Sequence, residues 1–312
     1  MQINDNVLNY DEKIIFSLRS LYSKYGYAPY KMSKFEEYDL YVKNKDFLIS
    51  DSVITFTDTN GKLMALKPDV TLSIIKNSKD ACETVQKLYY NENVYRISKG
   101  TKVFKEIMQV GLECIGNIDN YCIFEVLMLA AQSLKNISAD AILDISHLGV
   151  LSSIIDSFSV SYEMKQALMK CAAEKNLHEI SAICADNGIE PEKAELLADI
   201  ISFYGTPDEI LPKLKDIPEL SEAVEQLEAA LAPFEGNELK EMLRIDFSVV
   251  SDMKYYNGIV FKGFINGIPN SVLSGGQYDK LMEKMNRKSG AVGFAVYLDM
   301  LERLENQKGE IF

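Results

Sequence analysis

The chain has 312 residues, of which 47% are hydrophobic, and its 33 lysines and arginines against 46 aspartates and glutamates give a net charge of −13. This length and composition fit about two folded domains and exclude a wholly disordered chain. The acidity argues against a protein that binds nucleic acid or an anionic membrane over its whole surface. Residues 1–12 lack a signal-peptide pattern, and no apolar stretch is long enough to span a membrane, so we expect a cytoplasmic protein.

The predicted elements before residue 160 mix helices with antiparallel strands. Asn60-Gly61 predicts a hairpin because both residues tolerate the positive φ angles of a two-residue turn. Asp69 is placed to cap a short helix. In chain order we expect a helix at 11–25, hairpin strands at 53–56 and 63–66, a short helix from 69 to 76, long strands at 85–97 and 106–115, a helix at 119–134 and a strand at 141–146.

The acidity is concentrated in residues 161–240, which carry 17 acidic and 7 basic residues for a net charge of −10. This shift in composition predicts an acidic helical insertion domain at 161–240 within a core formed by residues 1–160 and 241–312. Apolar spacing predicts an all-helical insert. We expect helices at 161–175, at 191–203 with Pro191 in the first turn, and at 221–231 with Ser221 as cap, with Pro207, Pro212 and Pro218 in loops.

After the insert, strands return. We expect strands at 243–250 and 255–264, a turn at Asn266-Gly267 and a strand that ends at Leu273. Strands and helices do not alternate as in βαβ units, which argues against a parallel nucleotide-binding sheet. The prediction is an α+β fold in which helices flank an antiparallel sheet.

The cysteines and histidines indicate no metal site. The five cysteines form no Cys-x-x-Cys pair, which is typical of free thiols in a reducing compartment. His147 and His178 lack neighbouring acidic or cysteine ligands, so we expect structural roles for both and no cofactor.

Three segments have unusual polar residues. Gln109, Gly111 and Glu113 alternate along a predicted strand and share one face, which either lines a pocket or is exposed to solvent. Residues 255–258 (YYNG) open a strand with two tyrosines. Gly275-Gly276 is expected to end a strand, where it either allows a ligand to approach the backbone or marks a bulge. No phosphate-binding loop or nucleophile motif is present.

Taken together, collinear segments resemble the class II histidyl-tRNA synthetases. They are residues 66–71 (LKPDVT), the motif 2 strands at 94–96 (VYR) and 104–116 (FKEIMQVGLECIG), the histidine-specific strand at 255–261 (YYNGIVF), residues 274–279 (SGGQYD) and the start of motif 3 at 291–295 (AVGFA). The resemblance implies the class II synthetase-like antiparallel sheet and a pocket shaped for histidine.

The departures from the family concern catalysis. Ser98, Met300 and Ser251 stand at positions where the synthetases have an acidic residue and two arginines, and Tyr297 replaces a glycine that leaves room for adenosine. Because amino-acid activation needs cations on the phosphates, we expect adenylation to be lost. The sequence also ends at Phe312, so we expect the anticodon-binding domain to be absent and do not expect tRNA binding.

The histidine pocket is retained in this resemblance. By their family positions, Asp69, Thr71 and Gln109 would hold the α-ammonium group, and Glu113 and Tyr256 would contact the imidazole. Tyr255 is also expected to belong to the histidine-binding residues. Such acceptors suit an ammonium and an imidazole N–H. The carboxylate partner is left open, with Arg96 and Lys254 as candidates, because Ser251 replaces the arginine.

A synthetase-like core without adenylation is similar to the regulatory subunits of ATP phosphoribosyltransferase, the first enzyme of histidine biosynthesis. This family implies a short-form catalytic subunit as partner, a hetero-octamer with four copies of each chain, and feedback inhibition by L-histidine. A homodimer is expected through a weakly matched motif 1 around residues 25–27 and 35–38, where Ser33 stands in place of a proline. The alternatives are a truncated ligase that adenylates histidine for another acceptor, and a scaffold without ligand.

Overall fold

A computed structural model of the chain describes residues 7–44, 53–80, 84–98, 101–250 and 255–301. Within these residues a nine-stranded sheet crosses the core. In spatial order its strands are β1 (Ala28–Pro29), β5 (Gln86–Ile97), β6 (Phe104–Gly116), β12 (Gly290–Tyr297), β11 (Leu273–Gln277), β10 (Ile259–Ile265), β7 (Ala141–His147), β9 (Leu243–Asp246) and β8 (Tyr204–Gly205). All neighbouring strands are antiparallel except the β1–β5 and β7–β9 pairs, so the predicted α+β class with an antiparallel sheet is confirmed.

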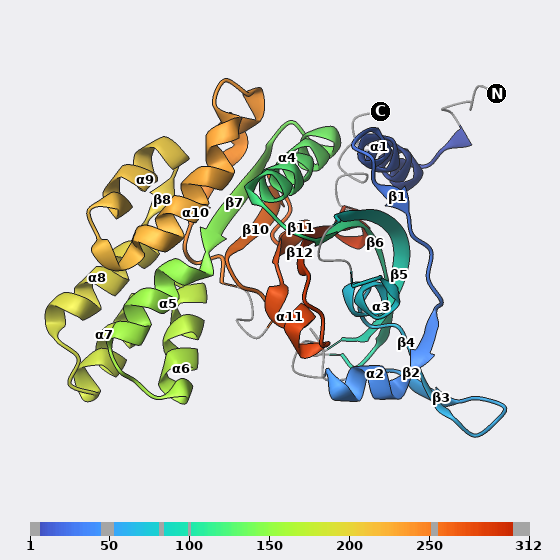
Figure 1. The fold of residues 1–312 in the computed structure, drawn as a ribbon, viewed down its shortest axis with the longest axis horizontal. Helices are drawn as coiled ribbons and strands as arrows, with labels where there is room; N and C mark the ends of the chain where they lie inside the picture. Colours follow the sequence, from blue (N-terminus) through green and yellow to red (C-terminus); the bar gives the residue numbers. More distant parts are fainter. Residues whose placement is uncertain (1–6, 45–52, 81–83, 99–100, 251–254, 302–312) are drawn as a thin grey trace.

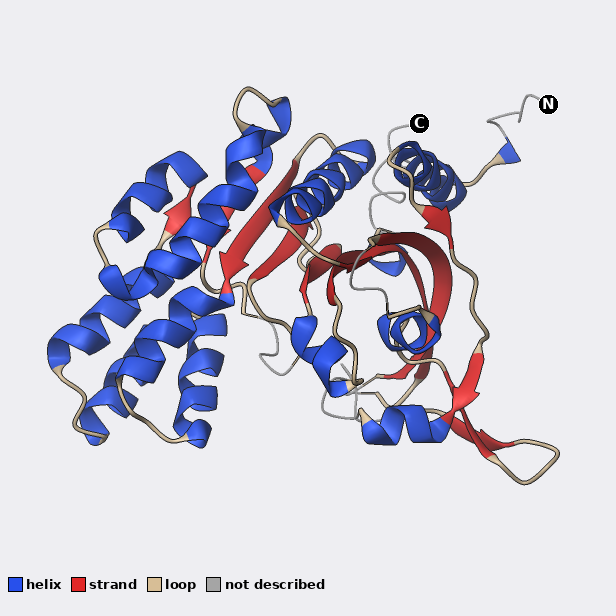
Figure 2. Cartoon of the chain, viewed as in Figure 1, coloured by secondary structure: helices blue, strands red, loops and turns tan. Residues whose placement is uncertain are grey.

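Helices cover the two faces of this sheet unequally (Figures 1 and 2). The elements outside the predicted insert are α1 (Tyr10–Lys24), α2 (Tyr38–Lys43), α3 (Thr71–Asn77), α4 (Asn120–Ile137), α5 (Leu148–Ser157), α11 (Asp279–Lys284) and the 3-10 turn η6 (Leu298–Met300). Helices α1 and α4 pack on one face, where Tyr22 and Ser133 share a buried hydrogen bond of 3.0 Å. The opposite face of the sheet meets α3 and carries the polar residues described below.

The predicted hairpin forms part of a second, three-stranded sheet. Its order is β2 (Phe35–Glu37), β4 (Leu63–Leu66) and β3 (Thr55–Thr57). The turn differs from the prediction, because only Gly61 has a positive φ, at 81°, and residues 58–62 form a longer loop. The Asp58 carboxylate holds this loop by accepting the backbone N–H groups of Asn60 and Lys62, each at 2.8 Å.

Residues 161–240 are largely helical, as predicted. The elements are α6 (Tyr162–Ala173), α7 (Leu177–Asp186), α8 (Pro191–Ser202), α9 (Pro207–Lys215), α10 (Ser221–Leu231) and the 3-10 turns η3 (Pro218–Leu220), η4 (Ala232–Phe234) and η5 (Glu238–Met242). The short strand β8 is an exception, because it pairs with β9 at the edge of the main sheet. The domain boundaries at 160 and 240 stay a prediction, since apolar side chains of these helices and of α4 form one buried cluster.

Two details of the insert were predicted wrongly. Pro207 and Pro218 begin helical elements and Pro212 lies inside α9, so none of the three lies in a loop. Thr206 and Glu209 cap the first turn of α9 reciprocally, and Pro212, which has no N–H, leaves the Asp208 carbonyl without the usual intrahelical donor. Ser221 makes no capping bond, because η3 leads directly into α10.

The strands that follow the insert are displaced from their predicted bounds. β9 ends at Asp246, whose carboxylate accepts the Ser248 N–H at 2.8 Å in a turn. β10 begins only at Ile259, because Gly258 has φ = 66° and bends the chain before it. The two glycines lie inside β11 and not, as was predicted, at the end of a strand. Glycine is required at 275 because a Cβ there would stand 2.4 Å from the Gly293 carbonyl oxygen. None of the described helices is both long and apolar enough to cross a membrane.

Candidate functional site

A small polar cavity, with about 40 Å³ of free volume, lies between the N-terminus of α3 and the sheet face formed by β5, β6, β11 and β12. Small-molecule sites usually hold roughly 300–1,000 Å³, so side chains of this wall must move apart to admit a ligand. The strand register brings its walls together, because Glu113 pairs with Gly293 and Gln109 with Tyr297 across β6 and β12. Charged and polar lining residues are Asp69, Thr71, Tyr90, Arg96, Gln109, Glu113, Tyr256, Ser274, Tyr278 and Tyr297.

Burial decides between the two readings of the polar strand face. Gln109 and Glu113 are 3% and 2% exposed, so this face of β6 lines a pocket and is not a solvent-exposed surface. Gly111 lies between them because no side chain fits there. A Cβ on Gly111 would stand 2.3 Å from the Phe294 carbonyl oxygen and 2.5 Å from the Tyr90 hydroxyl.

Glu113 is the central carboxyl group of the cavity. Its Oε1 accepts a hydrogen bond from the Thr71 hydroxyl at 2.8 Å, and its Oε2 accepts one from the Tyr278 hydroxyl. Burial raises the pKa of Glu113 to about 8, against the lowering effect of these two donors, and the charge of Asp69 adds to the rise. In the empty cavity at pH 7 this carboxyl group is therefore mostly protonated, and a cationic or N–H-donating ligand would stabilise its charged form.

Gly293 makes room for that carboxyl group. A Cβ at this position of β12 would lie 1.9 Å from Glu113 Oε2 and 2.5 Å from the Leu112 carbonyl oxygen. Any side chain here would therefore displace Glu113 from the cavity. The glycine on the neighbouring strand thus fixes where the carboxylate can sit.

Asp69 and Thr71 enter the cavity from the start of α3. The Asp69 carboxylate accepts the Leu72 N–H at 3.0 Å, which confirms the predicted capping contact. Burial raises the pKa of Asp69, while the Leu72 N–H and the Arg96 guanidinium lower it. Two buried carboxyl groups with few cations nearby form a site that favours an incoming positive charge.

The two tyrosines of the 255–258 segment have different places. Tyr256 lines the cavity, whereas Tyr255 lies behind it, with its ring 4.4 Å from that of Tyr256 and 5.9 Å from that of Tyr278. Tyr255 is itself 8% exposed, so this second layer is buried. The segment is held by Asn257, which accepts the Asp279 N–H at 2.7 Å and donates to the Asp279 carboxylate at 2.8 Å.

Arg96 is the single cationic side chain among the described residues that line the cavity. Its Nε donates to the Pro68 carbonyl oxygen at 3.0 Å, which holds the guanidinium near Asp69. Ser251 and Lys254, the other residues considered for a carboxylate, lie outside the described residues. Six of the seven predicted site residues thus line one cavity, and Tyr255 packs directly behind it.

The side of the cavity beyond Arg96 is closed by Tyr297. Its hydroxyl shares a hydrogen bond of 2.7 Å with Ser274 on the neighbouring strand, and burial raises its pKa. Met300 follows in η6 and packs against the apolar core instead of presenting a charge. The wall is therefore aromatic and neutral at this end.

Four polar cavity residues, Tyr90, Ser274, Tyr278 and Tyr297, were not predicted as site residues. Tyr278 lay in the segment 274–279, but its bond to Glu113 depends on how β11 meets β6 through β12. Tyr90 faces the cavity because it pairs with Gly111, a register that the sequence does not specify. Ser274 lines the cavity and shares a hydrogen bond with Tyr297, and nothing in the sequence indicated this contact.

The arrangement suits a small zwitterion, which carries one positive and one negative charge. Buried carboxyl, amide and hydroxyl oxygens can accept hydrogen bonds from an ammonium group and from a ring N–H, while Arg96 can take a carboxylate. Among the described residues no three metal-binding side chains come together. The charges and hydrogen-bonding groups of this lining are those that a zwitterion such as an amino acid would need.

The family model of histidyl-tRNA synthetase matches residues 5–301. The chain belongs to this family. An ATP phosphoribosyltransferase regulatory subunit from Caldanaerobacter subterraneus subsp. tengcongensis is 32% identical, over 94% of this chain and 78% of the relative. A histidine–tRNA ligase from Methanocaldococcus jannaschii is 30% identical, over 91% of this chain and 69% of the relative.

A solved structure supports the fold. A chain of the ATP phosphoribosyl transferase (HisG:HisZ) complex from Thermotoga maritima superposes with a TM-score of 0.72 at 20% identity, over 95% of this chain and 98% of that chain. The predicted synthetase-like fold is therefore confirmed. The family contains proteins named for two different activities, so the choice between them depends on the cavity.

Proposed function

We propose that this chain is the regulatory subunit of an ATP phosphoribosyltransferase in histidine biosynthesis. It would support the activity of a short-form catalytic subunit in the cytoplasm and transmit feedback inhibition by L-histidine. The observation that carries the proposal is the cavity itself, whose described lining has acceptors for an amino acid but one cation and an aromatic wall, where a nucleotide would need several cations. The regulatory subunit at 32% identity supports the same choice.

Each cavity residue has a role in this proposal. Asp69, Thr71 and Gln109 would accept the three hydrogens of the α-ammonium group. Glu113 and Tyr256 would bind the imidazole, whose ring N–H needs an acceptor that burial strengthens. Arg96 would take the carboxylate. Tyr255, which lies behind the cavity, would position Tyr256 without contacting the ligand.

Adenylation is proposed to be lost. Transfer to the α-phosphate of ATP needs cations placed where charge develops, and each missing donor costs about 10²–10³ in rate. Tyr297 and its bond to Ser274 occupy the cavity wall, and Met300 offers no charge. The alternative of a truncated ligase is supported by the histidine–tRNA ligase at 30% identity. Histidine-dependent ATP–pyrophosphate exchange by the purified chain would establish that alternative, whereas no exchange is expected here.

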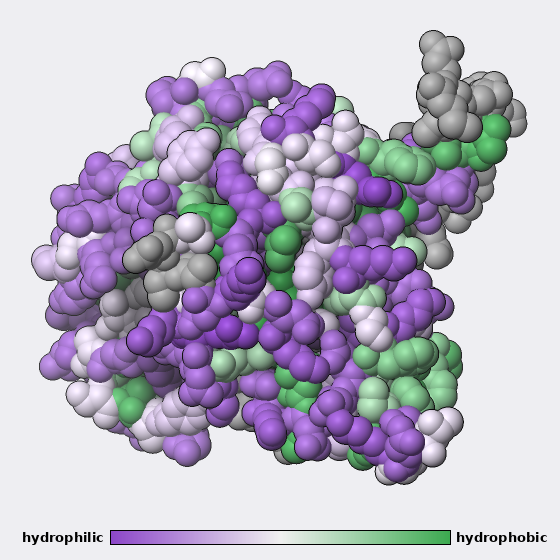
Figure 3. Space-filling model, turned by 45° about the vertical axis from the view of Figure 1, so that its right-hand side comes forward, coloured by the Kyte–Doolittle hydropathy of each residue, from purple (hydrophilic) through white to green (hydrophobic). Residues whose placement is uncertain are grey.

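The assembly is proposed to be a hetero-octamer of four regulatory and four catalytic chains, built on a homodimer of this chain. Apolar side chains of the small sheet support self-association, because Phe35, Phe56 and Leu63 are 50%, 38% and 46% exposed. Most of the face seen in Figure 3 is hydrophilic, and hydrophobic residues gather at its lower right. Histidine can regulate such an assembly only if it binds the active and inactive states with different affinities.

The proposed function is tested by reconstitution. The chain and a short-form catalytic subunit are mixed, and formation of phosphoribosyl-ATP is measured with and without L-histidine. We expect little activity from the catalytic subunit alone, full activity with this chain and inhibition by histidine. The same activity with and without this chain would contradict the proposal.

A further inference from the structure

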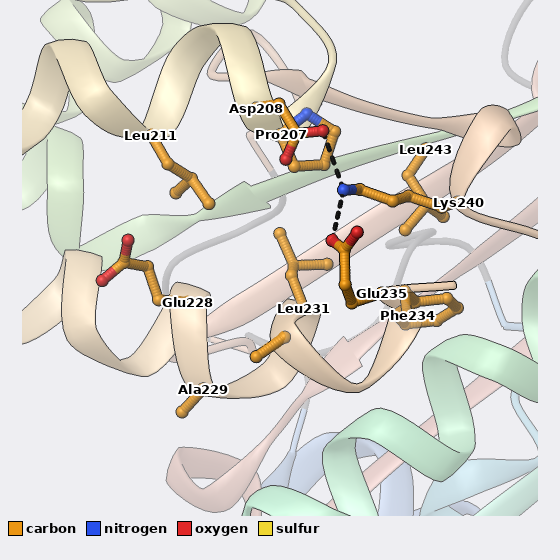
Figure 4. Close-up of a pocket in the computed structure, with 11 residues that line it drawn as sticks. Pro207, Asp208, Leu211, Glu228, Ala229, Leu231, Phe234, Glu235, Lys240 and Leu243 are labelled. Carbon is orange, nitrogen blue, oxygen red and sulfur yellow. Dashed lines mark hydrogen bonds and ion pairs between the residues drawn. The ribbon is translucent and has the colours of Figure 1, made fainter. Parts of the chain in front are cut away.

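A groove separate from the ligand cavity runs between α9 and α10 in the acidic insert (Figure 4). Its floor is apolar and formed by the buried residues Leu231, Phe234 and Leu243, with Leu211 half-buried on one side. In Figure 4 the Leu211 and Leu231 side chains extend into the space between the two helices. The groove has a volume of about 460 Å³, which is enough for one or two large side chains of another polypeptide.

At the mouth of this groove, two carboxylates form ion pairs with a lysine of the same chain. The Lys240 ammonium lies 2.7 Å from Asp208 and 2.6 Å from Glu235, and so connects α9 to the segment after α10. The Asp208 and Glu235 side chains are nevertheless 72% and 80% exposed, so much of each carboxylate remains open to a second cation. An arginine or lysine from outside can reach them beside Lys240.

Charge indicates the chemistry of the occupant. Residues 161–240 carry a net charge of −10, and the whole chain carries −13. A second copy of this chain would bring like charge to an acidic rim, and such like-charge contacts are unfavourable. A basic polypeptide gains both attraction to the rim and burial of an apolar side chain on the floor.

We infer that this groove binds a basic segment of the catalytic subunit, which places one apolar side chain between Leu211 and Leu231 and one lysine or arginine at Asp208 and Glu235. The inference rests on the proposed function for the identity of the partner. It assigns the acidic insert a role in assembly, away from the amino-acid cavity. The ligand cavity and the docking groove are then separate sites on one chain.

The test measures complex formation between the full-length chain and the catalytic subunit by sedimentation velocity and calorimetry. The double variant Asp208→Lys/Glu235→Lys reverses the rim, and Ala229→Tyr fills the groove without changing charge. The matched control is Glu195→Lys/Asp199→Lys, which reverses two exposed carboxylates on α8. Thermal unfolding and histidine binding check that every variant is folded.

We expect both groove variants to weaken complex formation at least tenfold, and the control to change it by less than twofold. Histidine binding should be unchanged in all three. Equal weakening by the control, or wild-type affinity in both groove variants, would overturn the inference while leaving the proposed function intact. If the wild-type chain forms no complex, both fail. Self-association of the isolated chain that is lost in the groove variants would assign the groove to a second copy and overturn the inference.

Discussion

The Thr71 hydroxyl donates a hydrogen bond of 2.8 Å to Glu113, and this contact joins the first residue of α3 to the C-terminal part of β6. The two residues are 42 positions apart in the chain. Glu113 also accepts a hydrogen bond from the Tyr278 hydroxyl, so one carboxyl group connects α3, β6 and the residue that follows β11. A ligand that changes the ionisation of Glu113 would therefore change hydrogen bonds in three parts of the fold.

Replacement of Glu113 tests imidazole recognition. Glu113→Gln keeps the size of the side chain but removes its charge, and loss of a hydrogen bond to a charged group costs about 1.5–3 kcal/mol. We expect histidine affinity to fall about 10- to 100-fold by calorimetry, and further in Glu113→Ala. Glu225→Gln, on the exposed side of α10, is the control. Unchanged affinity in Glu113→Gln would remove this residue from the site.

Arg96 is tested with a ligand that lacks the carboxylate. We expect the wild-type chain to bind L-histidine at least tenfold more tightly than histidinol, because only histidine pairs with the guanidinium. Arg96→Ala should bind both ligands with similar affinity. Arg96→Ala also removes the bond to Pro68, but this loss affects the binding of both ligands equally. The ratio of the two affinities therefore reports only on the carboxylate contact. A preference for histidine that survives in Arg96→Ala would assign the carboxylate to another residue.

Gly293 tests the geometry of the cavity. Gly293→Ala places a methyl group 1.9 Å from Glu113 Oε2, so the carboxylate must move. We expect histidine binding to be lost and the free energy of unfolding to fall by about 1–3 kcal/mol, as overpacking typically costs. Gly290→Ala on the same strand should bind histidine more nearly as wild type does, because its nearest neighbour is the tip of the Asp279 side chain, at 2.8 Å. Tight binding in Gly293→Ala would contradict the cavity described above.

The pKa of Glu113 predicts how stability depends on pH. In the folded chain this pKa is raised to about 8, against an ordinary value of 4.5. Between these two values the folded state holds a proton that the unfolded state has released, so this group makes stability fall as the pH rises, by up to about 1.36 kcal/mol per unit. The contribution of Glu113 to the free energy of unfolding is at its maximum below pH 4.5, falls between pH 4.5 and 8, and is constant again above pH 8.

Urea unfolding of the ligand-free chain at several pH values checks this slope. We expect Glu113→Gln to gain stability relative to wild type as the pH rises from 5 to 8. Asp144, whose pKa burial and the charge of Asp246 raise to about 6, keeps its own slope in both proteins and cancels in the comparison. A difference between the two proteins that stays constant with pH would show that Glu113 has an ordinary pKa.

Local patterns predicted most of the elements, and the resemblance to a family predicted most of the cavity. Helical spacing located α1 and α8, because one apolar stripe of each is buried, whereas α4 is apolar and buried on almost every side. Alternation on β6 indicated that Gln109 and Glu113 share a face. The pattern left open which face is buried, because that depends on α3, which comes from an earlier part of the chain.

The features that were missed depend on register and on backbone geometry. Tyr90 and Tyr278 reach the cavity only because β5 and β12 pair with β6 at one register. Gly258 has a positive φ and delays the start of the predicted strand to Ile259, and periodicity carries no signal for that. Tyr255 and Tyr256 are adjacent tyrosines, so only the folded chain separates the one that lines the cavity from the one behind it.

The central claim is that histidine in this cavity controls a partner enzyme. It is tested most directly by reconstituting a short-form catalytic subunit with wild-type chain or with Glu113→Gln, and measuring phosphoribosyl-ATP formation over a range of L-histidine concentrations. The account predicts activity with both chains, inhibition by histidine with wild type, and inhibition shifted to about 10- to 100-fold higher histidine with Glu113→Gln. Equal inhibition of the two complexes would contradict it.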